Sequence, residues 1–169
     1  VTLYSTESGS PKRPGTAVEY SVTSRGGFDQ HPTHPLFLCL HGWGSSEEDM
    51  AGIMRLIAPY NDFVALRGPL ALAKAPERSE MPGNYAWLHD ALPVGDDLDY
   101  DAYAAATAVD RWVAANIPAD RDVVPLGFSQ GGLVAVHLLR ITPERYRAVV
   151  SLSGFNAPGQ VPGGSGAGY

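Results

Sequence analysis

The chain has 169 residues, 44% of them hydrophobic and 18% charged, which suits one compact domain and is too apolar for a disordered chain. Its formal net charge of −6, without any basic block, argues against a nucleic-acid binder that works by neutralising phosphates. No apolar run reaches the ~18 residues of a membrane span, and the single cysteine, Cys39, excludes an internal disulfide. We therefore expect a cytoplasmic protein with no membrane span and an inert core thiol.

The first half of the chain alternates between strand and helix patterns. Residues 16–23 (TAVEYSVT) alternate as in a half-exposed strand, whereas the apolar run 36–40 (LFLCL) is typical of a strand buried on both faces. A helix is predicted over 47–58, with acids in its first turn and a serine cap before it. A second apolar strand is predicted over 62–66, followed by an irregular, proline-rich stretch over 70–84.

The second half continues the alternation. The pattern predicts a long amphipathic helix over 99–117, a buried strand over 122–128, a helix over 130–140 and a fourth buried strand over 147–152. Strands that alternate with helices from Leu36 onward indicate right-handed crossovers. The predicted class is therefore α/β, with a mainly parallel central sheet and helices on both faces.

A turn between the third buried strand and its helix carries the first chemical motif. Gly127-Phe128-Ser129-Gln130-Gly131 fits G-x-S-x-G, the pattern of a nucleophile elbow, in the strand-to-helix context that an elbow needs. The tight turn requires small residues on both sides of the serine, which the glycines provide. The elbow would present the Ser129 hydroxyl above the sheet and place the Gln130 N–H at a helix N-terminus. The alternative is a glycine-rich turn with an incidental serine.

The second motif follows the first buried strand directly. Stabilising a tetrahedral oxyanion takes two N–H donors, and a His-Gly-x-Gly loop after an earlier central strand is suited to supply one of them. We assign this donor to Trp43 in His41-Gly42-Trp43-Gly44. His41 is then expected to be a buried hydrogen-bonding support for the loop rather than a base. The alternative for the whole motif is a glycine turn that ends a strand.

Five segments of the chain carry a family resemblance, and they span residues 36–155: LFLCLHGWGSSEEDM, FVALRGP, YAWLHD, PLGFSQGGLVAVHLL and AVVSLSGF. They resemble the α/β-hydrolase fold and, within it, the phospholipase/carboxylesterase family, which includes the acyl-protein thioesterases. The resemblance implies a serine hydrolase that acts on small acyl esters or thioesters without a cofactor or metal. It implies Ser129 as the nucleophile and Trp43 with Gln130 as the oxyanion hole.

The same resemblance suggests where the substrate lies. Tyr85-Ala86-Trp87 falls where the family places a wall of the acyl pocket, so Tyr85 and Trp87 are candidate substrate-binding residues. Ordinary core packing by the two aromatic side chains is the alternative. Gly42 is the third candidate, because a glycine lets the backbone approach the substrate closely.

The base and acid that should activate the serine are not evident in the sequence. In this fold they follow the nucleophile, yet after Ser129 there is no Asp, one Glu (Glu144) and one His (His137). His137 lies eight residues on, ~12 Å along a helix axis, which is too far for a hydrogen bond to the serine. His89 is the only other conceivable base. We therefore expect a C-terminally incomplete hydrolase domain, and expect this chain alone to be inactive.

Three explanations compete: a fragment of a catalytic serine hydrolase, a natural or engineered truncation, and a partner subunit that supplies the histidine. We favour the fragment, with a hydrolase domain over 1–155 and a flexible, Gly/Pro-rich tail over 156–169. The edge of the strand 147–152 would then be exposed, so we expect the missing C-terminal segment or a second copy beside it. A non-catalytic hydrolase-fold protein that binds a small acyl ligand or a protein partner is the alternative function.

Two metal-like patterns are set aside. The acids at 97, 99 and 101 imitate the start of a calcium loop, but Ala102 and Ala108 stand where that loop needs Gly and Glu. We expect these acids to face the N-terminal dipole of the long helix instead. His31 and His34 lack a carboxylate or cysteine cluster to complete a metal site.

Overall fold

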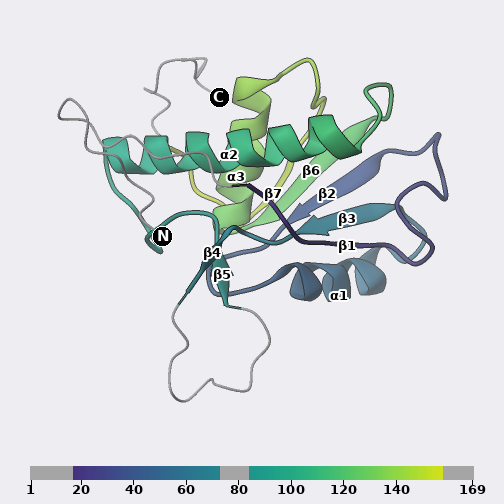
Figure 1. Cartoon of the computed structure of the whole chain (residues 1–169), viewed down its shortest axis with the longest axis horizontal. Helices are drawn as coiled ribbons and strands as arrows, with labels where there is room; N and C mark the ends of the chain where they lie inside the picture. Colours follow the sequence, from purple (N-terminus) through teal and green to yellow (C-terminus); the bar gives the residue numbers. More distant parts are fainter. Residues whose placement is uncertain (1–16, 73–83, 158–169) are drawn as a thin grey trace.

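A five-stranded central sheet organises the computed structural model, which describes residues 17–72 and 84–157 (Figure 1). The strand order is β1-β3-β2-β6-β7, with β1 antiparallel to β3 and all other neighbours parallel. The bounds are β1 Ser21–Thr23, β2 Leu36–Leu40, β3 Phe63–Leu66, β6 Val123–Phe128 and β7 Val150–Leu152. A separate two-stranded sheet pairs β4, Leu70–Ala71, with β5, Tyr85–Ala86.

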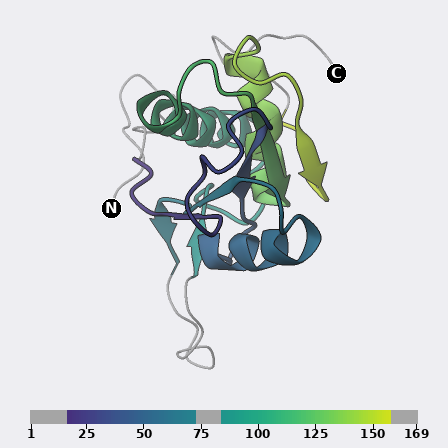
Figure 2. The same ribbon diagram turned by 90° about the vertical axis from the view of Figure 1, so that its right-hand side faces the viewer.

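Helices cover both faces of the central sheet. α1 (Glu47–Ile57) lies on one face, and α2 (Asp96–Asn116) and α3 (Gln130–Ile141) lie on the other (Figures 1 and 2). The side chains of β2 supply both cores in alternation: Leu38 packs into the cluster shared with α2 and α3, and Cys39 into the cluster under α1. This two-sided burial is why the strand is a continuous apolar run, and it confirms the predicted α/β class.

Cys39 is fully buried, as expected for a core thiol. Burial raises the pKa of its thiol to about 12, so the reactive thiolate is absent near neutral pH.

The prediction of a fourth buried strand over 147–152 was wrong. The strand β7 covers only Val150–Leu152, and Leu152 is 43% exposed. The reason is its place at the edge of the sheet, where it pairs with β6 and with no second strand among the described residues (Figure 2). The apolar run therefore predicted the strand correctly but not its exposure, whereas the expected exposed edge of this strand agrees with the strand order of the described residues.

The long helix begins three residues earlier than predicted, at Asp96 instead of Asp99. Gly95, at φ 60°, forms the boundary, and the acids of the first turn suit the positive end of the helix. Within the described ranges, no helix is long and apolar enough to cross a membrane.

The expected flexible tail over 156–169 falls almost wholly outside the described residues. Its second residue, Ala157, is buried, and its carbonyl accepts a hydrogen bond of 3.0 Å from Nη1 of Arg140 on α3.

Candidate active site

The turn from β6 into α3 has the backbone conformation expected of a nucleophile elbow. Ser129 takes φ 52° and ψ −116°, a left-handed conformation that a residue with a side chain adopts only under strain. The turn is anchored on the next strand, because the N–H of Ser129 donates to the carbonyl of Leu152 at 2.9 Å. Ser129 is half-buried, and its hydroxyl makes no capping hydrogen bond to α3.

Both glycines of the motif are required by their neighbours. A Cβ added to Gly127 would lie 2.0 Å from the carbonyl oxygen of Gly131. A Cβ added to Gly131 would lie 2.1 Å from the carbonyl oxygen of Leu40 in β2. No side chain fits either position, which confirms the expectation that the elbow needs small flanking residues.

The loop after β2 lies directly against this elbow. Since β2 and β6 are parallel neighbours and Leu40 pairs with Gly127, the carboxyl ends of both strands meet at one edge of the sheet. A Cβ on Gly42 would lie 3.1 Å from the Phe128 ring and 3.4 Å from Cβ of Ser129. The two motifs identified in the sequence are therefore in contact in space.

The buried side chain of His41 supports the loop through hydrogen bonds, as expected. Its ring is fully buried, and its Nε2 accepts a hydrogen bond of 2.9 Å from the N–H of Gly68. The proton of the neutral ring is therefore on Nδ1, which donates to the carbonyl of Gly42 at 2.7 Å. That carbonyl shares a planar peptide with the N–H of Trp43, so His41 orients this N–H. Burial lowers the pKa of His41, which keeps the ring neutral and unsuited to act as a charged acid.

The two N–H groups assigned as oxyanion donors make no hydrogen bonds to the rest of the described structure. Among the described residues, no hydrogen bond takes the backbone N–H of Trp43 or of Gln130. Gln130 is the first residue of α3, where helix N–H groups lack an acceptor and the helix dipole favours negative charge.

The two candidate aromatic residues occupy different environments. Trp87 is only 3% exposed and packs in the core, which matches the packing alternative. Tyr85 is half-buried and lines a cavity of about 400 Å³, together with Tyr20 and Arg67. The guanidinium of Arg67 lies 4.3 Å from the ring of Tyr20 and 4.4 Å from that of Tyr85, and it forms an ion pair with buried Glu47.

The other two histidines near α2 and α3 each lie close to charged side chains. His137 is buried in α3, and burial followed by the nearby charge of Arg140 lowers its pKa to about 4. His89 contacts the buried carboxylate of Asp101 through Nδ1, and its Nε2 lies 3.4 Å from the carboxylate of Asp90. Asp101 was expected only to complement the helix dipole, so its contact with His89 was missed by the sequence analysis.

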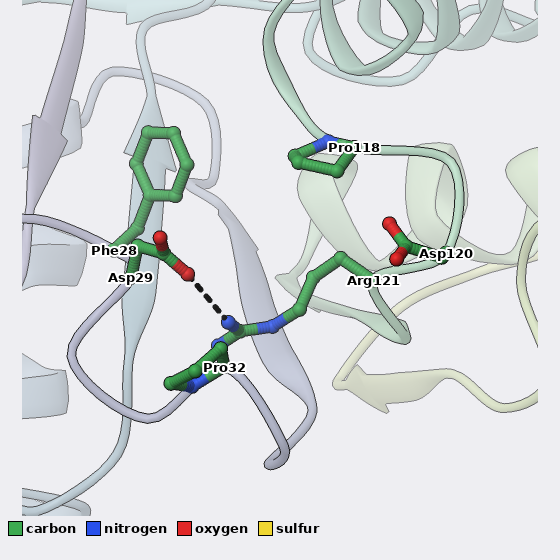
Figure 3. Close-up of a pocket in the computed structure, with 6 residues that line it drawn as sticks. All are labelled: Phe28, Asp29, Pro32, Pro118, Asp120 and Arg121. Atoms are coloured by element: carbon green, nitrogen blue, oxygen red, sulfur yellow. Dashed lines mark hydrogen bonds and ion pairs between the residues drawn. The ribbon is translucent and has the colours of Figure 1, made fainter.

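A second cavity is lined by Phe28, Asp29, Pro32, Pro118, Asp120 and Arg121 (Figure 3). It encloses about 190 Å³ between Phe28 and Pro118, with an ion pair between Asp29 and Arg121 at 3.2 Å. Arg121 lies two residues before the start of β6, and its second partner, Asp62, lies one residue before the start of β3, whereas Ser129 follows the end of β6. This cavity is therefore remote from the candidate active site, and it is smaller than a typical ligand pocket.

The remaining histidines also lie near this cavity. His31 donates its backbone N–H to Asp62 at 2.7 Å, and its Nδ1 lies 3.1 Å from the same carboxylate. The ring of His34 stacks on the ring of His31, with centroids 5.6 Å apart.

The fold and the arrangement of elbow and loop define an α/β-hydrolase. The model of the phospholipase/carboxylesterase family matches residues 28–162, so the chain belongs to this family. No curated protein sequence matches the chain.

Solved structures of similar fold include three esterase-like proteins. Esterase PE8 superposes with a TM-score of 0.56 at 20% identity, covering 85% of this chain and 66% of that one. A phospholipase/carboxylesterase from Dyadobacter fermentans gives 0.54 at 20% identity, with 82% and 61% covered. Acyl-protein thioesterase 2 from Zea mays gives 0.52 at 17% identity, with 81% and 60% covered. The chain thus spans less than two thirds of the length of each structure.

The buried histidine on α3 predicts a pH-dependent stability. An unfolded histidine takes up its proton near pH 6.5, whereas His137 in the folded chain does so only near pH 4. Between these values the unfolded state binds more protons, so the free energy of unfolding falls as the pH falls, by roughly 3 kcal/mol for this group. Urea unfolding of His137→Leu should lose this part of the pH dependence. The exposed His34→Gln is the control and should keep it; equal profiles for both variants would contradict the assignment.

Proposed function

We propose that this protein is a serine hydrolase that cleaves small carboxylic esters or thioesters through an acyl intermediate on Ser129. The observation that carries the proposal is the strained, positive-φ serine at a strand-to-helix turn, in contact with a loop that offers a second N–H. Membership of the phospholipase/carboxylesterase family supports the same reaction class.

The proposed reaction uses the groups in a fixed order. Oγ of Ser129 gives its proton to a general base as it bonds to the acyl carbon, and the carbonyl oxygen becomes an oxyanion. The N–H groups of Trp43 and Gln130 bind that oxyanion while the bond to the leaving alcohol or thiol breaks and the leaving group takes up the proton. Water then attacks the acyl-serine ester and releases the acid. Gly42 and Tyr85 are assigned to substrate binding, because Gly42 contacts the elbow and Tyr85 lines a cavity.

The proposed base is a group other than the five histidines described above. Nδ1 of His41 is engaged by Gly42 and Nε2 by Gly68, and both ring nitrogens of His89 face carboxylates. We place the base-bearing segment beside the edge of β7 that is unpaired among the described residues; β7 follows β6 in the sheet, and its Leu152 carbonyl accepts from the N–H of Ser129. The segment belongs to the same protein or to a second copy.

Labelling with an alkyl fluorophosphonate tests this function. The protein, expressed from its complete gene, should gain the mass of one phosphonyl group, and it should hydrolyse p-nitrophenyl esters over a limited range of acyl lengths. A protein that binds acyl ligands without catalysis, which the engaged histidines favour, would bind the ester and neither hydrolyse it nor gain mass. That result would reject the hydrolase.

A further inference from the structure

The side chain of Gln130 is fully buried and bonded at every polar position. Its Oε1 accepts from the backbone N–H groups of Trp87 and Leu88, each at 3.3 Å. Its Nε2 donates to the carbonyls of Asp90 at 2.7 Å and Ala91 at 3.1 Å. A carboxamide has two donors and two acceptor positions, so all four are used on one short segment of backbone.

The same segment is bonded to the other motif. The indole N–H of Trp87 donates to the carbonyl of His41 at 2.8 Å, immediately before Gly42 and Trp43. Trp87 therefore contacts both motifs, His41 through its indole and Gln130 through its backbone N–H. A continuous, buried, hydrogen-bonded bridge connects the loop after β2 with the first residue of α3.

The segment 87–91 is also bonded to α2. The backbone N–H of His89 donates to the Asp101 carboxylate at 3.2 Å, and the His89 ring contacts the same carboxylate. The segment is thus fixed to α2 as well as to α3. Buried polar groups with all partners satisfied specify one geometry, because any displacement leaves a donor or acceptor unpaired.

We infer that the Gln130 carboxamide and the Trp87 indole are positioning groups that fix the separation of the two oxyanion donors, the N–H groups of Trp43 and Gln130. The inference rests on the proposed function. The donors belong to two different strand-to-helix connections, and this bridge is a direct polar link between them. Donors that stabilise a transition state must be in place before the reaction, and a displacement of about 1 Å is enough to cost a large factor in rate.

Two variants and one matched control test the inference. Trp87→Phe removes the indole N–H, and Gln130→Met removes all four side-chain hydrogen bonds at similar length. Tyr146→Phe is the control, since it deletes one hydrogen bond of 2.7 Å from the fully buried Tyr146 to Asp110, away from the site. We expect phosphonylation of Ser129 to slow roughly 10- to 100-fold in both test variants, and kcat for esters to fall more than KM rises. The control should react at the wild-type rate.

Amide NMR separates this inference from the proposed function. The backbone ¹H–¹⁵N resonances of Trp43 and Gln130 should shift in Trp87→Phe and stay in place in Tyr146→Phe, whether or not the protein is labelled. Unshifted resonances, or wild-type labelling rates in folded Gln130→Met, would overturn the inference. An unlabelled wild-type protein would instead overturn the proposed function, with the NMR result still deciding on the bridge.

Discussion

Replacing Ser129 by alanine is expected to abolish labelling by the fluorophosphonate and to lower kcat for ester hydrolysis on the order of 10⁴-fold or more. Alanine keeps the elbow and both oxyanion donors but has no oxygen to attack the acyl carbon. The hydroxyl does not cap α3, so the free energy of unfolding should change little. Intact mass, initial rates and urea unfolding measure the three quantities.

Ser24→Ala is the matched control for this substitution. Ser24 accepts a hydrogen bond from the N–H of Phe63 at the start of β3, remote from the elbow. The control should label and hydrolyse as the wild type does. Labelling that persists in Ser129→Ala would show that another residue is the nucleophile.

The largest effect on stability is expected from Gly131→Ala. The new Cβ would lie 2.1 Å from the carbonyl oxygen of Leu40 and 2.6 Å from that of His41. Both contacts are with backbone, so α3 must move away from β2, at a cost of about 3 kcal/mol or more. Urea unfolding followed by circular dichroism should show this loss, or no folded protein at all.

Gly52→Ala provides the comparison, because it makes the same chemical change within α1. A Cβ at Gly52 has no neighbour within 4 Å, and alanine is the better helix former, so the expected gain is up to ~1 kcal/mol. Equal stability for the two variants would contradict the close approach of α3 to β2.

The main elements of the fold could be predicted because burial on both faces leaves a clear pattern. Both ends of the strand Leu36–Leu40 were predicted correctly, since a strand between two helix layers needs apolar side chains at every position. The strand 147–152 shows the limit of this reasoning. Its sequence AVVSL over 148–152 is also mostly apolar, but the burial of a strand depends on whether another strand lies beside it, and composition alone does not encode that.

The candidate site could be predicted in part for a topological reason. The elbow and the loop each follow a buried parallel strand, and carboxyl ends of adjacent parallel strands meet at one edge of a sheet. The polar bridge could not be predicted in this way. Gln130 is 43 residues from Trp87 in the chain, and His89 is 12 residues from Asp101. Such pairs depend on how helices and loops pack, and a motif centred on Ser129 gives no sign of them.

A crystal structure of the protein after reaction with the fluorophosphonate tests the central claim most directly. The account predicts a phosphonyl group bonded to Oγ of Ser129, with one phosphoryl oxygen about 2.7–3.1 Å from the backbone nitrogens of both Trp43 and Gln130. A phosphonyl group on another residue, or an oxygen directed away from both nitrogens, would contradict it.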